Sequence, residues 1–189
     1  MNLAMRTSAA LILAFALVVG ATYGHVAGKE YAQGVVAADG SMHVPENFRT
    51  DYVMLGSWAV TGDADTGDSI GLHVVYAPKS AVEVYRRTGK FPDGTVLVKE
   101  LFNGKTENLT TGKATSAASG AGYFVMVKDD KGRFPGNPLW GDGWGWSFFN
   151  ADNTRRTITK DYRKECLGCH VPARSTDFVY VDAYPVLKP

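Results

Sequence analysis

The chain has 189 residues, a formal net charge of +1 with mixed signs along its length, and 45% hydrophobic residues. Such a balance provides no strongly basic or acidic surface, so neither nucleic acid nor a membrane surface is expected as a partner. The length suits one domain with one core, and 12% aromatic residues with 21 glycines favour strands and turns over a helical bundle.

The first 24 residues have the layout of a secretory signal peptide. Arg6 precedes an apolar run at residues 9–19, and small residues follow. This run is shorter than the roughly 20 residues that span a bilayer, so a permanent membrane anchor is the weaker alternative. We expect cleavage after Gly24 or Ala27, a single domain over residues 28–189, a periplasmic location, and no membrane association after processing.

The N-terminal part of the mature chain predicts two strands. Residues 28–40 are polar and weakly patterned, and we expect an N-terminal arm with at most one short helix. Residues 51–60 (DYVMLGSWAV) and 70–77 (IGLHVVYA) are rich in apolar and aromatic residues, which predicts strands. The turn-rich segment TGDADTGDS between them, residues 61–69, predicts a loop.

A helix and a third strand are expected next. Pro78 can occupy the first turn of the helix, Gly89 can end it, and one face carries its apolar residues, Ala81, Val82 and Tyr85. The turn FPDG leads into TVLVKELF, residues 95–102, which predicts a strand. Residues 103–121 are rich in Gly, Ser, Thr and Lys and too long for a tight turn, so we expect a mobile loop or part of a pocket rim.

The C-terminal third predicts two more strands, at residues 122–129 and 143–150, joined by a Pro/Gly-rich connection. A helix capped by Thr157 or Thr159 is expected to carry residues 162–169, and the tail TDFVYVDAYPVL is expected to be extended. Strands with only two short helices and no βαβ rhythm predict a mainly β (α+β) fold, an antiparallel sheet with helices packed against it.

The segment KECLGCHVPA contains the only two cysteines of the chain, Cys166 and Cys169, directly followed by His170. Residues i and i+3 share a helix face, so both sulfurs can reach the two vinyl groups of one porphyrin while the imidazole points at the iron. One alternative is a redox dithiol, which lacks its usual βαβ context, and another is half of a zinc site, which needs further ligands. In an exported chain, the motif predicts one covalently attached haem c with His170 as the metal ligand.

The second axial position of such a haem separates an electron carrier from a catalyst or gas sensor. Met42, Met54 and Met126 lie in or beside apolar runs, which favours packing roles over ligation. His73 lies on the same side of its strand as Val75, so it faces either the haem pocket or solvent. A distal-pocket role for His73 competes with that of a half-buried histidine bonded to a backbone carbonyl.

Lys99 is the second polar residue of interest. It alternates with leucines on one side of its strand, whereas Glu100 lies on the other side with Val98 and Phe102, so each apolar face carries one charge. We expect one of these charges to point inward. A desolvated lysine has a lowered pKa and can act as a nucleophile, and the alternative is a lysine that snorkels from a strand edge or pairs with a carboxylate.

Rings are concentrated in LWGDGWGWSFF, just before the cysteine motif. A porphyrin has a large flat apolar face that rings can cover, although an ordinary aromatic core has the same pattern. We expect scaffold and pocket-wall roles for these five residues, Trp140, Trp144, Trp146, Phe148 and Phe149.

Taken together, these motifs resemble those of the cytochrome P460 family, which includes the cytochromes c′-beta. The resemblance is carried by GKFPDGTVLVKELF, by the GYF strand and by ECLGCH followed by STDFVYVDAYPVLK, and it runs from about Val44 to Lys188. It implies a predominantly β homodimer with a five-coordinate haem whose proximal ligand matches His170. In the P460 branch, a lysine at the position of Lys99 is joined to a porphyrin meso carbon.

The resemblance also implies an activity: oxidation of hydroxylamine, binding of nitric oxide, and transfer of electrons to a redox partner protein. Lys99 and His73 are then the expected catalytic residues, with Asp161 a second choice as the proton acceptor. A c′-beta-like protein that binds nitric oxide or carbon monoxide without turnover is one alternative, and a simple electron carrier is another. The gas binder would need a hydrophobic distal wall, for which the candidates are Phe91, Phe102 and Phe124.

Overall fold

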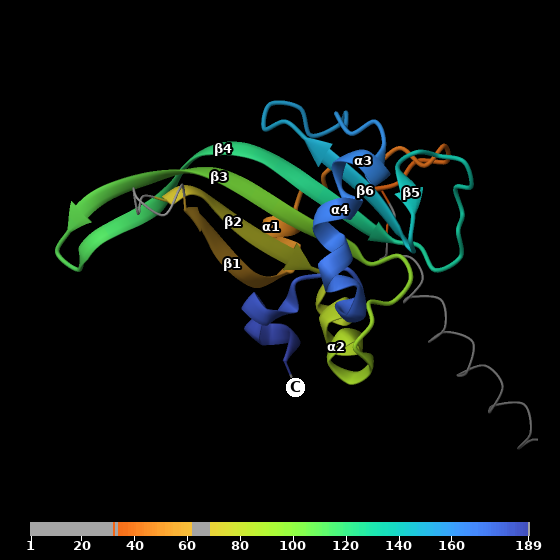
Figure 1. Cartoon of the computed structure of the whole chain (residues 1–189), viewed down its shortest axis with the longest axis horizontal. Helices are drawn as coiled ribbons and strands as arrows, with labels where there is room; N and C mark the ends of the chain where they lie inside the picture. The colour runs from red at the N-terminus through yellow and green to blue at the C-terminus, as the bar shows by residue number, and fades with distance from the viewer. Residues whose placement is uncertain (1–31, 33, 62–68, 189) are drawn as a thin grey trace, which may run out of the picture.

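The computed structural model describes residues 32, 34–61 and 69–188. Its centre is a six-stranded antiparallel sheet with the strand order β1-β2-β3-β4-β6-β5 (Figure 1). The mainly β fold class predicted from the sequence is therefore confirmed. The expected signal peptide and most of the loop at residues 61–69 lie outside the described residues. The strands are β1 (Val53–Thr61), β2 (Ser69–Ala77), β3 (Val96–Leu109), β4 (Gly112–Lys128), β5 (Trp140–Gly141) and β6 (Trp144–Phe149).

The helices are short, and the longest, α2, follows the sequence prediction. It begins directly after Pro78 and ends at Gly89, whose φ of 68° lies in the left-handed region that glycine tolerates. None of the helices in the described part of the chain is long and apolar enough to cross a membrane. The α-helices are α1 (Phe48–Asp51), α2 (Lys79–Thr88), α3 (Tyr162–Glu165) and α4 (Leu167–His170), and the 3₁₀ turns are η1 (Val171–Thr176), η2 (Val181–Ala183) and η3 (Pro185–Leu187).

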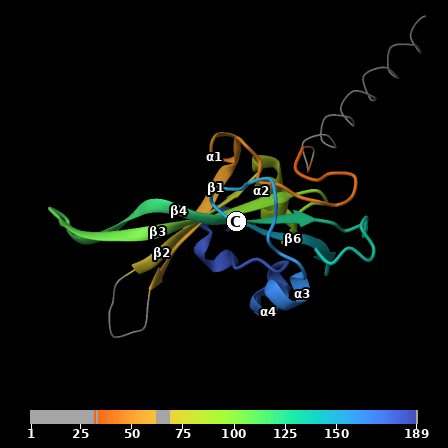
Figure 2. The same ribbon diagram turned by 90° about the horizontal axis from the view of Figure 1, so that it is seen from above.

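The sheet has a hydrophobic cluster on each face. On one face α3, α4 and the C-terminal turns pack over Trp146 and its neighbours, and α1 lies on the opposite face (Figure 2). Residues 34–48 also contribute to that opposite face, where Val35, Met42 and Phe48 are buried in one cluster with Val98. The expectation of a polar N-terminal arm at residues 28–40 is therefore wrong where this segment is described, because Val35 packs in the cluster and Val36 bridges to Met42.

Residues 103–121 form a two-stranded hairpin, so the prediction of a loop is wrong. β3 runs on to Leu109 and β4 starts at Gly112, and this part of the hairpin extends beyond the ends of β1 and β2 (Figure 1). The hydroxyl groups of Thr106 and Thr115 bond across it at 2.8 Å. Because most side chains here are exposed and polar, the segment lacks the apolar alternation by which strands are recognised.

The C-terminal segment also differs from the prediction of one helix followed by an extended tail. Cys166, with φ −126° and ψ −50°, separates α3 from α4, and Asp161 caps α3 by accepting a bond from the backbone of Arg163. Thr157 and Thr159 therefore do not cap it. The tail folds into 3₁₀ turns, in which Pro185 has no N–H to donate to a strand ladder.

Candidate functional site

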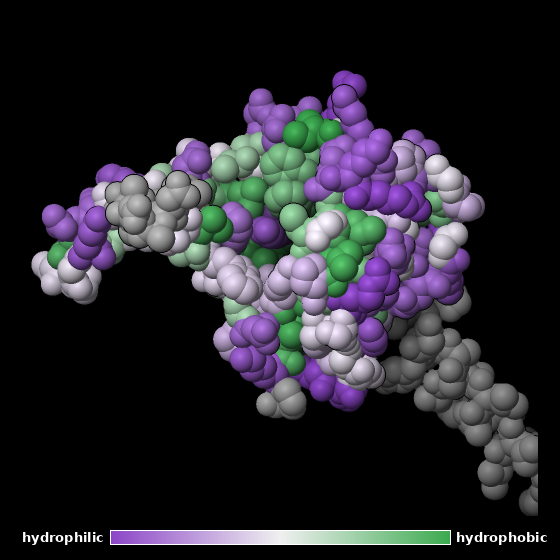
Figure 3. All heavy atoms as spheres, in the orientation of Figure 1, coloured by the Kyte–Doolittle hydropathy of each residue, from purple (hydrophilic) through white to green (hydrophobic). Residues whose placement is uncertain are grey.

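A cavity of about 440 Å³ lies between the sheet and α4. In the space-filling view, hydrophobic residues border a hollow on this face of the molecule (Figure 3). Strands β1 to β4 and β6 supply one wall and the C-terminal segment supplies the other. Most of the lining is apolar or aromatic, including Trp58, Val75, Leu97, Phe124, Met126, Trp146 and Val179.

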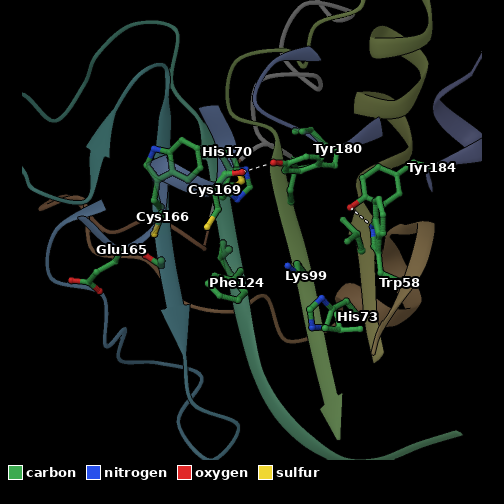
Figure 4. A pocket seen from close by; sticks show the side chains of 18 of the residues that line it. Trp58, His73, Lys99, Phe124, Glu165, Cys166, Cys169, His170, Tyr180 and Tyr184 are labelled. Atoms are coloured by element: carbon green, nitrogen blue, oxygen red, sulfur yellow. Dashed lines mark hydrogen bonds between the residues drawn. The ribbon is translucent and has the colours of Figure 1, made fainter. Parts of the chain in front are cut away.

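Cys166, Cys169 and His170 line the cavity from the side of α4 (Figure 4). Both cysteines are free thiols, Cys166 buried and Cys169 exposed. Burial raises the pKa of the Cys166 thiol to about 11, with a further contribution from the charge of Glu165. The motif thus presents two thiols and an imidazole to one apolar space.

The orientation of His170 is set by a backbone carbonyl. Its Nδ1 lies 2.7 Å from the oxygen of Phe178, which can only accept, so Nδ1 carries the proton and Nε2 has the free lone pair. Burial lowers the pKa of His170, and the charge of Lys99 lowers it further against the effect of that hydrogen bond. The ring also meets Trp146 edge-on, with centroids 5.0 Å apart. A neutral imidazole with a fixed tautomer is the form that binds a metal ion.

Lys99 enters the cavity from the centre of the sheet. In the register of the strands, β3 places it between Val75 of β2 and Phe124 of β4, and its Nζ lies 5.1 Å from the centroid of the Phe124 ring. Burial lowers the pKa of Lys99. The sequence predicted that one of the two charges of this strand points inward, but both do. Glu100 is buried on the opposite face of the sheet, where it pairs with Arg49.

His73 lies on β2 and lines the same cavity, which is one of the two orientations that its strand position allowed (Figure 4). It is half-buried, and burial lowers its pKa, as does the positive charge of Lys99. His73 is therefore neutral at neutral pH and can accept a proton.

Four further residues at the cavity were not identified from the sequence. Trp58 of β1 donates its indole N–H to the hydroxyl of Tyr184 at 3.2 Å, and the hydroxyl of Tyr180 donates to the backbone oxygen of Cys169 at 2.5 Å (Figure 4). Glu165 is the only carboxylate among the described lining residues, and it accepts bonds from two backbone N–H groups before α3. For Tyr180 and Tyr184 the one signal in the sequence is the aromatic content of the tail, which predicts an extended segment.

The candidate sixth ligands are dispersed. Met126 lines the cavity, whereas Met42 is buried on the other face of the sheet and Met54 is 48% exposed. Asp161, the second candidate for a proton acceptor, caps α3 and does not line the cavity.

Only one of the three phenylalanines expected to form a distal wall lines the cavity. Phe124 lines the cavity, Phe91 is buried in the core beside Trp144, and Phe102 lies outside the wall. Of the five rings of the LWGDGWGWSFF segment, Trp146 lines the cavity, and Trp144 is buried in the same hydrophobic cluster. Trp140 and Phe149 are buried on the opposite face of the sheet, which makes them scaffold.

The sequence profile of cytochrome P460 matches residues 45–181. The chain belongs to the cytochrome P460 family. A comparison with curated proteins gave no match. Membership in this family identifies the protein as a haem cytochrome and its chemistry, in general terms, as that of a haem-dependent oxidoreductase.

The residues of the cavity fit a haem. Its lining is mainly apolar, as a porphyrin face requires, and Trp146 supplies an indole on the wall beside His170. The imidazole presents an unprotonated Nε2, and the two thiols flank the same space. Within the described residues, no cluster of three or more His, Cys, Asp or Glu side chains forms an alternative metal site.

Proposed function

We propose that this protein is an exported c-type cytochrome with one haem, which oxidises hydroxylamine, binds nitric oxide and passes electrons to an external acceptor. The observation that carries the proposal is the position of Lys99. Its amine, with a pKa lowered by burial, shares a cavity with both cysteines and His170. A lysine in this position is what the P460 branch of the family requires.

The two cysteines and the histidine would hold the cofactor. Cys166 and Cys169 would form thioether bonds to its vinyl groups, and the Nε2 of His170 would be the proximal ligand. When bound, the haem supplies an open coordination site for the nitrogen ligand and a route for electrons out of it. The carbonyl of Phe178 keeps His170 in one tautomer and makes it a stronger donor.

Lys99 and His73 would supply the remaining chemistry. The desolvated amine of Lys99, whose pKa is lowered by burial, is available for the covalent link to a porphyrin meso carbon that the resemblance implies. Oxidation of two hydroxylamine molecules to nitrous oxide and water releases four electrons and four protons, so the site needs a proton acceptor. His73 is neutral and lines the cavity, which suits this role.

The cellular setting forms part of the proposal. Residues 1–24 would direct the chain to the periplasm, a redox partner protein would take the electrons, and the mature protein would be a homodimer. A molar mass from light scattering on the purified holoprotein tests the dimer, and mass spectrometry of its N-terminus tests the cleavage.

A second candidate is reversible binding of nitric oxide or carbon monoxide without turnover. It is favoured by the character of the cavity, whose lining is mainly apolar and includes Phe124 beside Lys99. Glu165 is the one carboxylate among the described lining residues, and it already accepts hydrogen bonds from two backbone N–H groups. A wall of this kind favours an uncharged diatomic ligand over a reaction that releases protons.

The two candidates are separated by a turnover assay on the holoprotein with hydroxylamine and an artificial electron acceptor. The proposal predicts turnover that is lost in Lys99→Ala and retained in Lys105→Ala. Lys105 is a matched control because it lies on the same strand but is 65% exposed and pairs with Glu107. No turnover in the unmodified protein, together with reversible nitric oxide binding, would establish the second candidate instead.

A further inference from the structure

The carbonyl that orients His170 belongs to a strained turn. Asp177 and Phe178 are consecutive, and both have positive φ, 62° and 64°. Asp adopts this left-handed conformation at modest cost, whereas Phe rarely does. Two such residues in sequence persist only where surrounding contacts hold them. The conformation is what turns the Phe178 oxygen back toward His170, at 2.7 Å from Nδ1.

A buried ion pair holds this turn. The Nζ of Lys128, at the end of β4, lies 3.2 Å from Oδ1 of Asp177, and the two side chains are only 8% and 5% exposed. The second carboxylate oxygen of Asp177 accepts the backbone N–H of Phe91 at 3.0 Å. Asp177 is thus attached both to the sheet and to the segment after α2.

Lys128 remains charged in this position. Burial alone would lower its pKa, but the hydrogen bond to Asp130 and the charges of Asp177 and Asp130 raise the pKa above its ordinary value. The ammonium also lies 3.4 Å from the oxygen of Gly143 and 5.1 Å from the centroid of the Trp144 ring. No group of this cluster lines the haem cavity.

We propose that Lys128 and Asp177 are positioning residues for the proximal ligand, an inference that rests on the proposed role of His170. Their ion pair fixes the left-handed turn, and the turn aims the Phe178 carbonyl at Nδ1 of His170. The strength of that hydrogen bond sets how strongly the imidazole donates to iron. The pair therefore tunes the reduction potential of the iron without touching the cofactor.

The sign of the potential change in Lys128→Met tests this idea. If the ion pair only contributes charge, removing a positive group cannot raise the potential, because a lost cation favours the oxidised iron or has no effect. If the pair positions the carbonyl, its loss weakens the donor and the potential rises. The iron–histidine stretching frequency in the resonance Raman spectrum of the ferrous protein should fall at the same time.

Asp130→Asn is the matched control. Asp130 lies 2.8 Å from the same ammonium but is 52% exposed, and its removal leaves the ion pair between Lys128 and Asp177 in place. The reduction potential and the iron–histidine frequency should therefore stay as they are in the unmodified protein. A lower or unchanged potential in Lys128→Met, with an unchanged stretching frequency, would overturn the proposal.

A second variant covers the case in which Lys128→Met yields no holoprotein. Asp177→Asn keeps a residue that tolerates positive φ and an oxygen for the N–H of Phe91, but it removes the ion pair. Its iron–histidine frequency should fall, and an unchanged frequency would overturn the proposal. If the unmodified holoprotein lacks an iron–histidine band, the failure belongs to the proposed role of His170 and not to the positioning pair.

Discussion

Lys99 and Glu100 are adjacent on β3 and project to opposite faces of the sheet, Lys99 into the haem cavity and Glu100 into the buried cluster behind it. The two side chains have different partners. Lys99 lies over the Phe124 ring, and Glu100 accepts bonds from the guanidinium of Arg49 and is 1% exposed. The strand that presents the amine is therefore anchored from behind by an ion pair.

Removing Arg49 should destabilise the protein. In Arg49→Met the buried carboxylate of Glu100 loses its charged partner, and we expect the free energy of unfolding to fall by about 1–3 kcal/mol, because Arg49 itself is half exposed. Urea unfolding of the holoprotein measures this. The double variant Arg49→Met, Glu100→Met should recover part of the loss because no unpaired charge is left. A double variant less stable than Arg49→Met would contradict this account of the pair.

The pH dependence of turnover should report His73. A proton acceptor works only when unprotonated, and burial and Lys99 both lower the pKa of His73 from its ordinary value of roughly 6.5. The rate should therefore be flat near neutral pH and decline only on acidification below that ordinary value. His73→Gln should lower the rate by about 10²- to 10⁴-fold at neutral pH. The titration of hydroxylamine itself affects both proteins equally, so the test is the ratio of the rate of the unmodified protein to that of the variant. This ratio should fall on acidification, and a ratio that does not change with pH would exclude His73.

Gly141 should not tolerate a side chain. A Cβ there would lie 2.0 Å from the hydroxyl oxygen of Tyr162, which donates to Asp142 at 2.8 Å, and Tyr162 stacks on Trp146 beside the cavity. Gly141→Ala should lower the free energy of unfolding by about 1–3 kcal/mol through overpacking.

Gly120→Ala is the control for this substitution, because its new Cβ would meet only the Cβ of Ala151, at an ordinary distance of 3.7 Å. Denaturant unfolding compares the two variants. Equal stability of both would mean that Tyr162 can move away from Gly141 at no cost.

The sequence predicted those parts of the fold whose apolar residues recur with a strand or helix period. β1, β2 and α2 were recognised in this way, and the glycine at position 89 marked the end of α2 correctly. The hairpin at residues 103–121 was missed because its strands are exposed on both sides. Residues 34–48 were missed because four apolar side chains in a polar segment have no clear period, yet they cover one face of the sheet.

The sequence likewise predicted some residues of the candidate site and missed others. The cysteine and histidine spacing and the alternation around Lys99 and His73 pointed to side chains that the structure brings to one cavity. Trp58, Tyr184 and the carbonyl of Phe178 depend on how the C-terminal tail folds back. That path is determined by left-handed residues and a buried ion pair between positions 49 apart in the chain, Lys128 and Asp177, and local propensity does not report either.

Whether Lys99 is joined to the haem is decided by the ferrous absorption spectrum of the purified holoprotein, recorded with its intact mass for the unmodified chain and for Lys99→Ala. We expect one covalently bound haem in both proteins and, in the unmodified chain alone, a ferrous Soret band moved far to the red of ordinary c-type haem. Such a band would establish the link to Lys99. An ordinary c-type spectrum that the substitution leaves unchanged would contradict the account and remove Lys99 from the mechanism.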